Sequence, residues 1–322
     1  MALSKSATLS AVQRFSTTRA GAWAMLIFSN ALFAGSYVSA KLTLREISPI
    51  MINVLRFSLA SLVLLPIVIA GRKRLRFPAR MLPRFAGLVL MGFVLNKLLE
   101  YAGLNLTTAS DTALLISTET IFTAILSWVV LREHFSRAVA LALGVGLAGV
   151  YLIIERGFIP HLEDAAGGTG ARVLGDLLVI GALLFESGYT VSGKSLLSRF
   201  PPLLITAASV IGSLVFWLPL GAEEVIRTGW PELSFQGWFG VAWLAICVTV
   251  IGYFLWFQAL TVVDATSAAS SLFVQPLLGT LSAIIFLGEG LTWATIAGGM
   301  LILVSVYFVS RPKGAAVQTP AE

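Results

Sequence analysis

Long apolar segments recur along the whole chain, and each is bounded by charged or turn-forming residues. An α-helix needs about 20 mainly apolar residues to cross a hydrocarbon layer about 30 Å thick. Strands of alternating polarity, typical of membrane β-barrels, are not visible in the sequence. The pattern predicts an all-α polytopic membrane protein with ten transmembrane helices, near residues 20–40, 49–70, 82–103, 110–131, 136–154, 173–194, 202–221, 237–260, 265–287 and 291–310.

The composition agrees with a membrane protein and excludes a soluble globular enzyme. Of 322 residues, 57% are hydrophobic and 12% are charged, and the mean hydropathy is +0.90. Soluble domains carry about 25% charged residues. Ten spans use about 200 residues, so no room remains for a second, soluble domain. Cys247 is the single cysteine, so the chain forms no intrachain disulfide.

The net charge of +6 raises the question of a nucleic-acid partner, but most basic residues lie in short connections between apolar segments. They cluster before the first span and in the even-numbered connections and the tail, at Lys5, Arg14, Arg19, Arg72, Lys73, Arg74, Arg76, Arg80, Arg84, Arg132, Arg137, Arg199, Arg311 and Lys313. The odd connections carry fewer, Arg45, Arg156, Arg172 and Arg227, among more acidic neighbours. The positive-inside rule therefore predicts both termini on the cytoplasmic side of the bacterial inner membrane, with the lipid bilayer and no nucleic acid as partner.

The first apolar segment has an alternative reading as a cleaved signal peptide. Basic residues precede it, and Val38-Ser39-Ala40 resembles a cleavage site. The segment is longer than a typical signal core, and a later part of the chain repeats it, so a transmembrane span is favoured.

Two halves of the chain resemble each other at matched positions. Lys41, Pro49 and Pro66 correspond to Lys194, Pro202 and Pro219 at an offset of 194 − 41 = 153. Leu104, Ala109, Glu133 and Tyr151 correspond to Leu260, Ala265, Glu289 and Tyr307 at an offset of 289 − 133 = 156. A longer loop in the second half, around Glu223 to Ser234, would explain the change of offset. Chance similarity in leucine-rich sequence is the alternative.

An odd number of spans in each half makes the second half enter the bilayer inverted, as in many secondary transporters. The predicted organisation is a cytoplasmic N-terminal segment (1–19), a first five-helix repeat (20–155), a connecting loop (156–172), a second five-helix repeat (173–310) and a cytoplasmic tail (311–322).

Short motifs at the end of the fourth span of each half extend this picture. They read Leu131-Arg132-Glu133 and Leu287-Gly288-Glu289, and the second copy also has Gln275-Pro276 and Gly298-Gly299. The first copy has Glu119-Thr120 where the proline would fall. This layout resembles the EamA-type branch of the drug/metabolite transporter superfamily and is most similar to bacterial exporters of amino acids, aromatic ones included. The resemblance implies ten helices around a central cavity and export of small metabolites by alternating access. It does not specify the substrate.

Ionisable residues inside spans are the first candidates for a site, because each costs about 2.5 to 3.5 kcal/mol at a helix centre. Glu119 and Glu186 lie near the middles of their spans and are the best candidates for substrate contact or for carrying a proton. Facilitated diffusion without protons remains open. Lys97 and Glu100 form either an intrahelical ion pair or a substrate contact. Arg56 either faces the interior or snorkels to the surface.

Aromatic and amide side chains complete the candidate set, because they suit a cavity for amphipathic solutes. For Tyr101 and Trp256, near span ends, an interfacial aromatic belt is the favoured alternative. The predicted substrate-binding residues are Asn30, Tyr37, Tyr101, Glu119, Glu186, Tyr189, Trp256 and Gln275.

An intramembrane enzyme is the rival of a different class. The two histidines, His134 and His161, lie in loops and stand apart, so they do not form a His-Glu-x-x-His motif. No Walker sequence is present. We therefore expect no catalytic residues, metal or cofactor. A multidrug or lipid-linked substrate exporter remains open on the same fold.

Small residues on the fifth and tenth spans bear on the oligomeric state. Ala140, Gly144 and Ala148, and Ala294 and Gly298, recur at four-residue spacing, which permits close helix contact. Internal packing is favoured, and a monomer and a homodimer both remain open.

Overall fold

The computed structural model describes residues 18–71, 79–131, 137–155, 169–197, 200–263, 268 and 270–310, and these residues contain helices and turns but no strand. The helices of the first half are α2 (Arg19–Thr43), α3 (Pro49–Gly71), η2 (Ala79–Met81), α4 (Leu82–Val89), η3 (Leu90–Leu95), α5 (Asn96–Leu106), α6 (Ala109–Leu115), α7 (Thr118–Leu131) and α8 (Arg137–Glu155). Those of the second half are α9 (Thr169–Leu196), α10 (Pro202–Thr228), α11 (Phe235–Ala242), η5 (Trp243–Gly252), α12 (Tyr253–Leu260), η6 (Ser270–Phe273), α14 (Val274–Leu287) and α15 (Trp293–Ser310).

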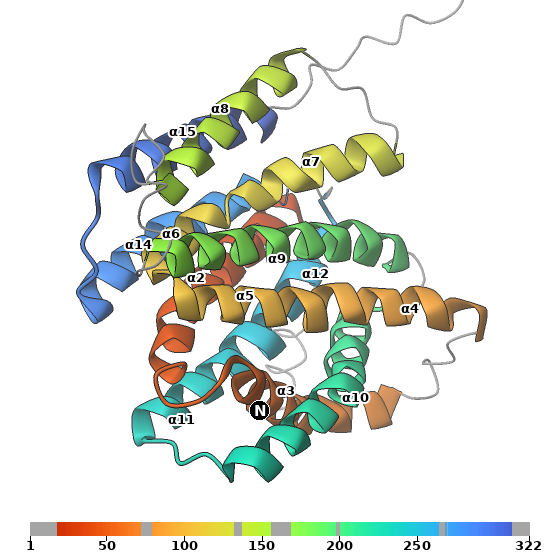
Figure 1. The fold of residues 1–322 in the computed structure, drawn as a ribbon. Helices are drawn as coiled ribbons and strands as arrows, with labels where there is room; N and C mark the ends of the chain where they lie inside the picture. Colours follow the sequence, from red (N-terminus) through yellow and green to blue (C-terminus); the bar gives the residue numbers. More distant parts are fainter. Residues whose placement is uncertain are drawn as a thin grey trace, which may run out of the picture.

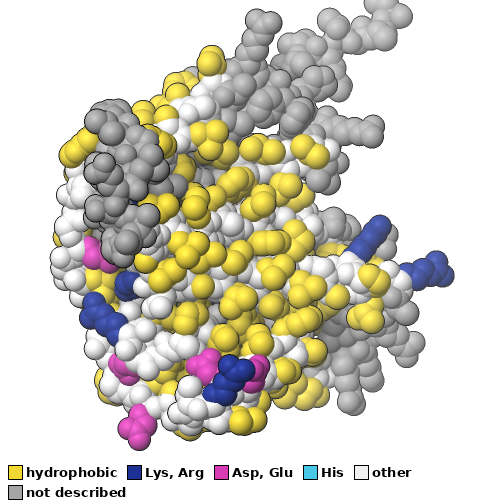
Figure 2. All heavy atoms as spheres, in the orientation of Figure 1, with side chains coloured by type: hydrophobic (Ala, Val, Ile, Leu, Met, Phe, Trp, Pro, Cys, Tyr) yellow, Lys and Arg dark blue, Asp and Glu magenta, His cyan; other side chains and the backbone are white. Residues whose placement is uncertain are grey.

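Within the described ranges, six helical segments are long and apolar enough to cross a membrane: α2, α3, α4-η3-α5, α9, α10 and α11-η5-α12. Their outer faces carry exposed apolar side chains, for example Leu62 on α3 and Val215 on α10. Figure 2 shows hydrophobic side chains across the middle of the visible face, with charged side chains towards its edges. Apolar surface of this extent is stable in lipid and not in water, so the chain is a multi-pass membrane protein.

Helices from the two halves pack against one another in pairs. The pair α8 and α15 lies at the top of Figure 1, and α3 packs against α10 at the bottom. Between these pairs, α5 lies along α9, and α2 contacts α14, η5 and α12. The centre of the protein is thus enclosed by helices of both halves.

Glycines permit close contact between α8 and α15. A Cβ atom on Gly149 would lie 2.5 Å from the carbonyl oxygen of Gly298, and one on Gly298 would lie 2.6 Å from that of Gly149. Gly298 therefore packs within the chain, between α8 and α15, as close small-residue contacts in membranes allow. Gly144 has nothing within 4 Å of its Cβ position. The internal contact face of α8 is therefore not the predicted stripe that contains Gly144.

The seventh and the fourth predicted spans differ from the structure. Helix α10 continues to Thr228, beyond the predicted end at 221, and Gly229 with φ 82° ends it. The connection expected from Glu223 to Ser234 is thus helical over its first part. The predicted span 110–131 is interrupted at Ile116 and Ser117, which separate α6 from α7.

The third and eighth predicted spans each contain a π-helical segment, η3 and η5. Such segments leave backbone groups in need of partners. The indole Nε1 of Trp217 donates a hydrogen bond to the carbonyl of Phe93 in η3, at 2.8 Å. In η5 the hydroxyl of Thr249 donates to the carbonyl of Leu244, at 2.7 Å. Side chains therefore stabilise both irregular segments.

Several sequence predictions lie outside the described residues. These are most of the N-terminal segment, the tail, much of the connecting loop, and the residues Lys5, Arg14, Arg72, Lys73, Arg74, Arg76, Arg132, Glu133, His134, Arg156, His161, Arg199, Ala265, Arg311 and Lys313.

Candidate functional site

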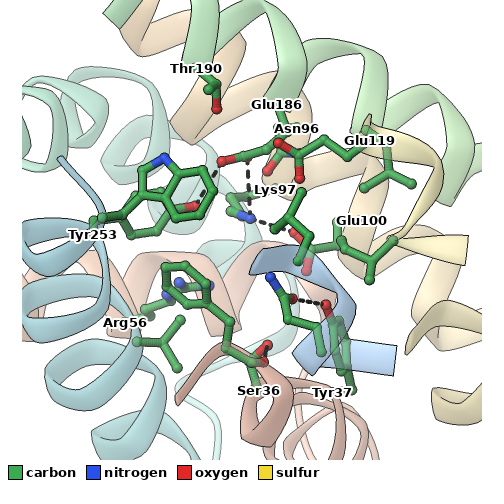
Figure 3. Close-up of a pocket in the computed structure, with 17 residues that line it drawn as sticks. Ser36, Tyr37, Arg56, Asn96, Lys97, Glu100, Glu119, Glu186, Thr190 and Tyr253 are labelled. Carbon is green, nitrogen blue, oxygen red and sulfur yellow. Dashed lines mark hydrogen bonds and ion pairs between the residues drawn. The ribbon is translucent and has the colours of Figure 1, made fainter. Parts of the chain in front are cut away.

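A cavity of about 50 Å³ lies in the centre of the bundle, and Figure 3 shows the residues around it. Helices α2, α3, α5, α7 and α9 contribute to its wall, as do η5, α12, η6 and α14. A volume of this size holds a few water molecules. A metabolite therefore fits only after the surrounding helices separate.

Buried ionisable groups dominate one side of the cavity. The ammonium of Lys97 lies 2.5 Å from a carboxylate oxygen of Glu100, one turn further along α5. It also lies 3.7 Å from Oε2 of Glu186 on α9. Tyr253 donates a hydrogen bond to the other oxygen of Glu186, at 3.4 Å. Lys97 and Glu100 thus form the intrahelical ion pair that was one of the two interpretations of the sequence, and the pair faces the cavity.

Arg56 is the second cation of the cavity wall, and its side chain does not snorkel. The residue is 1% exposed. Its Nε donates to the hydroxyl of Thr249 at 2.7 Å, and its Nη1 donates to the hydroxyl of Tyr101. The guanidinium carbon also lies 5.2 Å from the centre of the Phe57 ring. The inward orientation is thus fixed by hydrogen bonds and by an aromatic neighbour.

A chain of hydrogen bonds links α2 to the second half of the protein. Tyr37 donates to Oε1 of Gln275 at 2.5 Å, and Nε2 of Gln275 donates to Oδ1 of Asn30 at 2.6 Å. The amide nitrogen of Asn30 then donates to the hydroxyl of Ser271 at 2.8 Å. Each of these residues is buried. Tyr37 and Gln275 line the cavity, whereas Asn30 lies behind them and holds the amide of Gln275.

Tyr189 packs beside the cavity and not on its wall. Its ring centre lies 5.3 Å from the ring centres of Phe93 and Phe257, and 6.1 Å from that of Tyr253. A Cβ atom on Gly92 would come within 2.4 Å of the same ring. The ring therefore fills space between α9 and its neighbours.

Tyr101 and Trp256 are 1% and 5% exposed, so the interfacial-belt interpretation is wrong for both. Trp256 lies on the cavity wall. Tyr101 lies behind it, where its hydroxyl accepts the hydrogen bond from Arg56. Burial places the polar ends of both side chains inside the protein and not at a lipid headgroup layer.

The structure brings five of the eight predicted residues to the cavity wall: Tyr37, Glu119, Glu186, Trp256 and Gln275. Asn96 and Tyr253 also line the wall, although they are not among the predicted substrate-binding residues, and so do Arg56, Lys97 and Glu100, for which the sequence left two interpretations. The signal for the three ionisable residues was present, since a charge inside a span is costly unless it faces a polar interior. Nothing in the pattern of apolar residues distinguishes Tyr253 from an interfacial tyrosine.

Polar contacts also join the two halves away from the cavity. The carboxylate of Glu289 accepts hydrogen bonds from the backbone N–H groups of Ala109 and Ser110, at 3.0 and 2.8 Å. The carboxylate of Glu46 accepts one from the N–H of Ser234, at 2.7 Å. These acidic side chains hold the first turn of α6 and the turn before α11. Glu289 belongs to the Leu287-Gly288-Glu289 motif, so the motif has a direct structural role.

Comparisons with known proteins agree with this architecture. The sequence matches the EamA-like transporter family over residues 20–155 and again over residues 173–311. An uncharacterized transporter of Archaeoglobus fulgidus is 29% identical over 292 residues, which cover 90% of this chain and 99% of the relative. A protein of Streptantibioticus cattleyicolor, described as a probable terminal-alkyne amino-acid exporter, is 24% identical over 290 residues, which cover 90% of this chain and 93% of that one.

A solved crystal structure with 20% sequence identity shares the fold, with a TM-score of 0.62 over 90% of this chain and 96% of the other. The family match extends over most of the sequence, on both sides of the central connection. The chain therefore belongs to the EamA-like transporter family of the drug/metabolite transporter superfamily, whose members are membrane transporters and not enzymes.

Proposed function

We propose that the protein is a secondary transporter that exports small metabolites, foremost amino acids with aromatic or other apolar side chains, across the bacterial inner membrane. The observation that carries this proposal is the central cavity, which combines buried ion-pairing groups with aromatic and aliphatic wall residues. Such a wall suits solutes that have both a charged end and an apolar end. The similarity to a probable amino-acid exporter of Streptantibioticus cattleyicolor supports the same class of solute.

Transport by alternating access needs two halves that move relative to one another around a shared site. We propose ten spans in two inverted five-helix repeats, 20–155 and 173–310, joined by the connection 156–172. Two separate matches to one family support the repeat. A pair of contacts supports it too. Lys41 of α2 donates to the carbonyl of Thr107, and Lys194 of α9 donates to that of Val263.

These contacts occupy matched positions in the two halves. The lysines differ by 194 − 41 = 153 and the acceptors by 263 − 107 = 156, which are the offsets of the sequence repeat. Lys194 lies 3.1 Å from its acceptor oxygen. In each half, therefore, the lysine near the end of the first helix bonds to the chain that follows the third helix. In this proposal the two contacts lie on opposite sides of the membrane, and the basic even connections support a cytoplasmic position for both termini.

The substrate site in this proposal consists of Tyr37, Glu119, Glu186, Trp256 and Gln275, with Asn30, Tyr101 and Tyr189 as supporting residues. Alternating exposure of the wall requires that the narrow cavity widen towards one side at a time. The interruption between α6 and α7 and the π-helical segments offer points at which the helices can bend.

Counterflow in proteoliposomes tests the proposal. Vesicles are loaded with one unlabelled amino acid and diluted into a trace of the same labelled compound, and the series covers the common amino acids. We expect transient accumulation for aromatic and large aliphatic amino acids, and none in protein-free vesicles. If no amino acid gives counterflow while cationic dyes or fluorescent lipids are moved, the protein is a multidrug or lipid-linked substrate exporter and the proposal is wrong.

A further inference from the structure

Arg56 differs from the other charged residues of the cavity in the way its charge is compensated. Its Nη2 has no hydrogen-bond partner, and no carboxylate of the described residues lies within ion-pair distance of its guanidinium. Lys97, by contrast, contacts both Glu100 and Glu186. A buried charge without a counter-ion is costly and marks a functional site.

The guanidinium is held in place by neutral groups alone. The hydroxyls of Thr249 and Tyr101 accept from Nε and Nη1, and the rings of Phe57 and Tyr101 flank the guanidinium carbon. These contacts fix the orientation of the planar group and leave Nη2 without a hydrogen-bond partner. An oriented guanidinium recognises a carboxylate more strongly than a mobile ammonium does.

Carboxylates with unused acceptor oxygens lie across the cavity from Arg56. Glu119 has no hydrogen bond or ion pair to its carboxylate within the described part of the chain, and Oε2 of Glu186 accepts no hydrogen bond there. Figure 3 shows Arg56 on one side of Lys97 and the side chains of Glu119 and Glu186 on the other, pointing toward one another. Apolar wall residues, among them Phe33, complete the cavity.

We propose that Arg56 binds the carboxylate of a zwitterionic α-amino acid, whose ammonium group faces Glu119 and Glu186 and whose apolar side chain contacts the remaining wall. This inference rests on the proposed function and narrows its substrate class. Amines, amides and esters that lack the free carboxylate bind weakly, because they leave the guanidinium without a partner. Arg56 is therefore the residue that sets specificity for the carboxylate.

The test compares two ligands in two proteins. L-phenylalanine and L-phenylalaninamide differ in the carboxylate, and at about pH 6.5 both retain the ammonium group. Inhibition of labelled L-phenylalanine counterflow gives the affinity of each for the wild-type protein. Thermal stabilisation in detergent gives it independently, also for variants that no longer transport. The variants are Arg56→Gln, Arg56→Lys and, as a control at an exposed site, Arg227→Gln.

In the wild-type protein we expect L-phenylalanine to bind about 10- to 150-fold more tightly than the amide, the range for a hydrogen bond to a charged group. Arg56→Gln should lose this preference and retain its affinity for the amide, and Arg56→Lys should retain part of it. Arg227→Gln should behave as wild type. If Arg56 had a purely structural role, Arg56→Gln would lower the affinity for both ligands equally.

Two outcomes separate the inference from the proposed function. If the wild-type protein binds and moves L-phenylalanine but Arg56→Gln retains the wild-type preference over the amide, the role of Arg56 is wrong and amino-acid export stands. If the wild-type protein moves neither L-phenylalanine nor any other amino acid of the counterflow series, the proposed function itself is wrong.

Discussion

Replacing Glu119 by glutamine removes the cavity carboxylate that contacts no cation among the described residues. Arg56 and Lys97 bring two positive charges to the cavity wall, and Glu100, Glu119 and Glu186 bring three negative ones. Lys97 lies within 4 Å of Glu100 and Glu186 but not of Glu119. In a site of low dielectric constant the surplus carboxylate needs a cation, which is either a proton or the ammonium group of the solute.

Competition of a proton and the solute for one carboxylate produces exchange transport. If the solute carries no net charge and one proton moves the opposite way, each pH unit across the membrane contributes about 1.4 kcal/mol. This free energy corresponds to about tenfold accumulation of solute in the more acidic compartment. The variant Glu119→Gln cannot take up the proton at this position, so we expect the concentration ratio to fall to about one. Counterflow should continue at lower affinity, because Glu186 still faces the ammonium group of the solute.

The assay measures the steady-state solute ratio in proteoliposomes with an imposed pH difference of one unit and the membrane potential clamped at zero. The ratio does not depend on how the protein is oriented in the vesicle. Glu223→Gln serves as the control, because the carboxylate of Glu223 is exposed and pairs with Arg227 at 2.6 Å. It should keep the tenfold ratio.

A tenfold ratio in Glu119→Gln would exclude Glu119 as the proton carrier. Glu186 is then tested in the double variant with Glu119→Gln, because its Oε2 is buried and accepts no hydrogen bond from the described residues. If pH-driven accumulation survives in the double variant, neither carboxylate carries the proton and the charge argument fails.

Tyr37→Ala should weaken solute binding by about 1 to 3 kcal/mol, the range for a buried contact residue, whereas Tyr307→Ala, at a residue 53% exposed, should leave affinity unchanged. Equal losses in counterflow affinity for the two variants would contradict the position of the cavity. Gln275→Leu should lower stability by about 1 to 3 kcal/mol, because it leaves the buried hydroxyl of Tyr37 without its acceptor, and Tyr37→Phe in the same chain should recover part of this loss in thermal unfolding. Cysteines at the exposed positions Arg80 and Glu232, in a Cys247→Ser background, should react with impermeant reagents from opposite sides of the membrane; labelling from the same side would contradict the topology.

The helix boundaries could be predicted where the end of an apolar segment coincides with a turn residue. Pro49 and Pro202 begin α3 and α10, as the pattern indicated, because proline fits the first helical turn. The end of α10 could not be predicted in this way. Its last turns are polar, with Glu223 and Arg227 paired four residues apart, and a search for apolar segments stops before them.

The sequence predicts the buried carboxylates of the candidate site, but not the direction in which its tyrosine side chains point. Glu119 and Glu186 stood out because an ionised group inside a span must face a polar interior, and both line the cavity. Tyr189 could not be placed, since the spans are apolar on most faces and their sequence gives little indication of which side turns inward. The direction of Tyr253 depends on the π-helical segment before it, which the periodicity of an α-helix does not reveal.

The π-helical segment Leu90–Leu95 also limits where the chain can lose a residue without a change in the cavity. Successive residues of an α-helix are rotated by about 100°. Deleting one residue from this segment would restore regular α-helical bonding and turn Asn96–Leu106 by about that angle relative to α4. Lys97 and Glu100 would then leave the cavity together, although every remaining side chain in the protein would be unaltered. In aligned relatives, a single-residue gap at this point is therefore expected to accompany a different set of charges at the centre of the bundle.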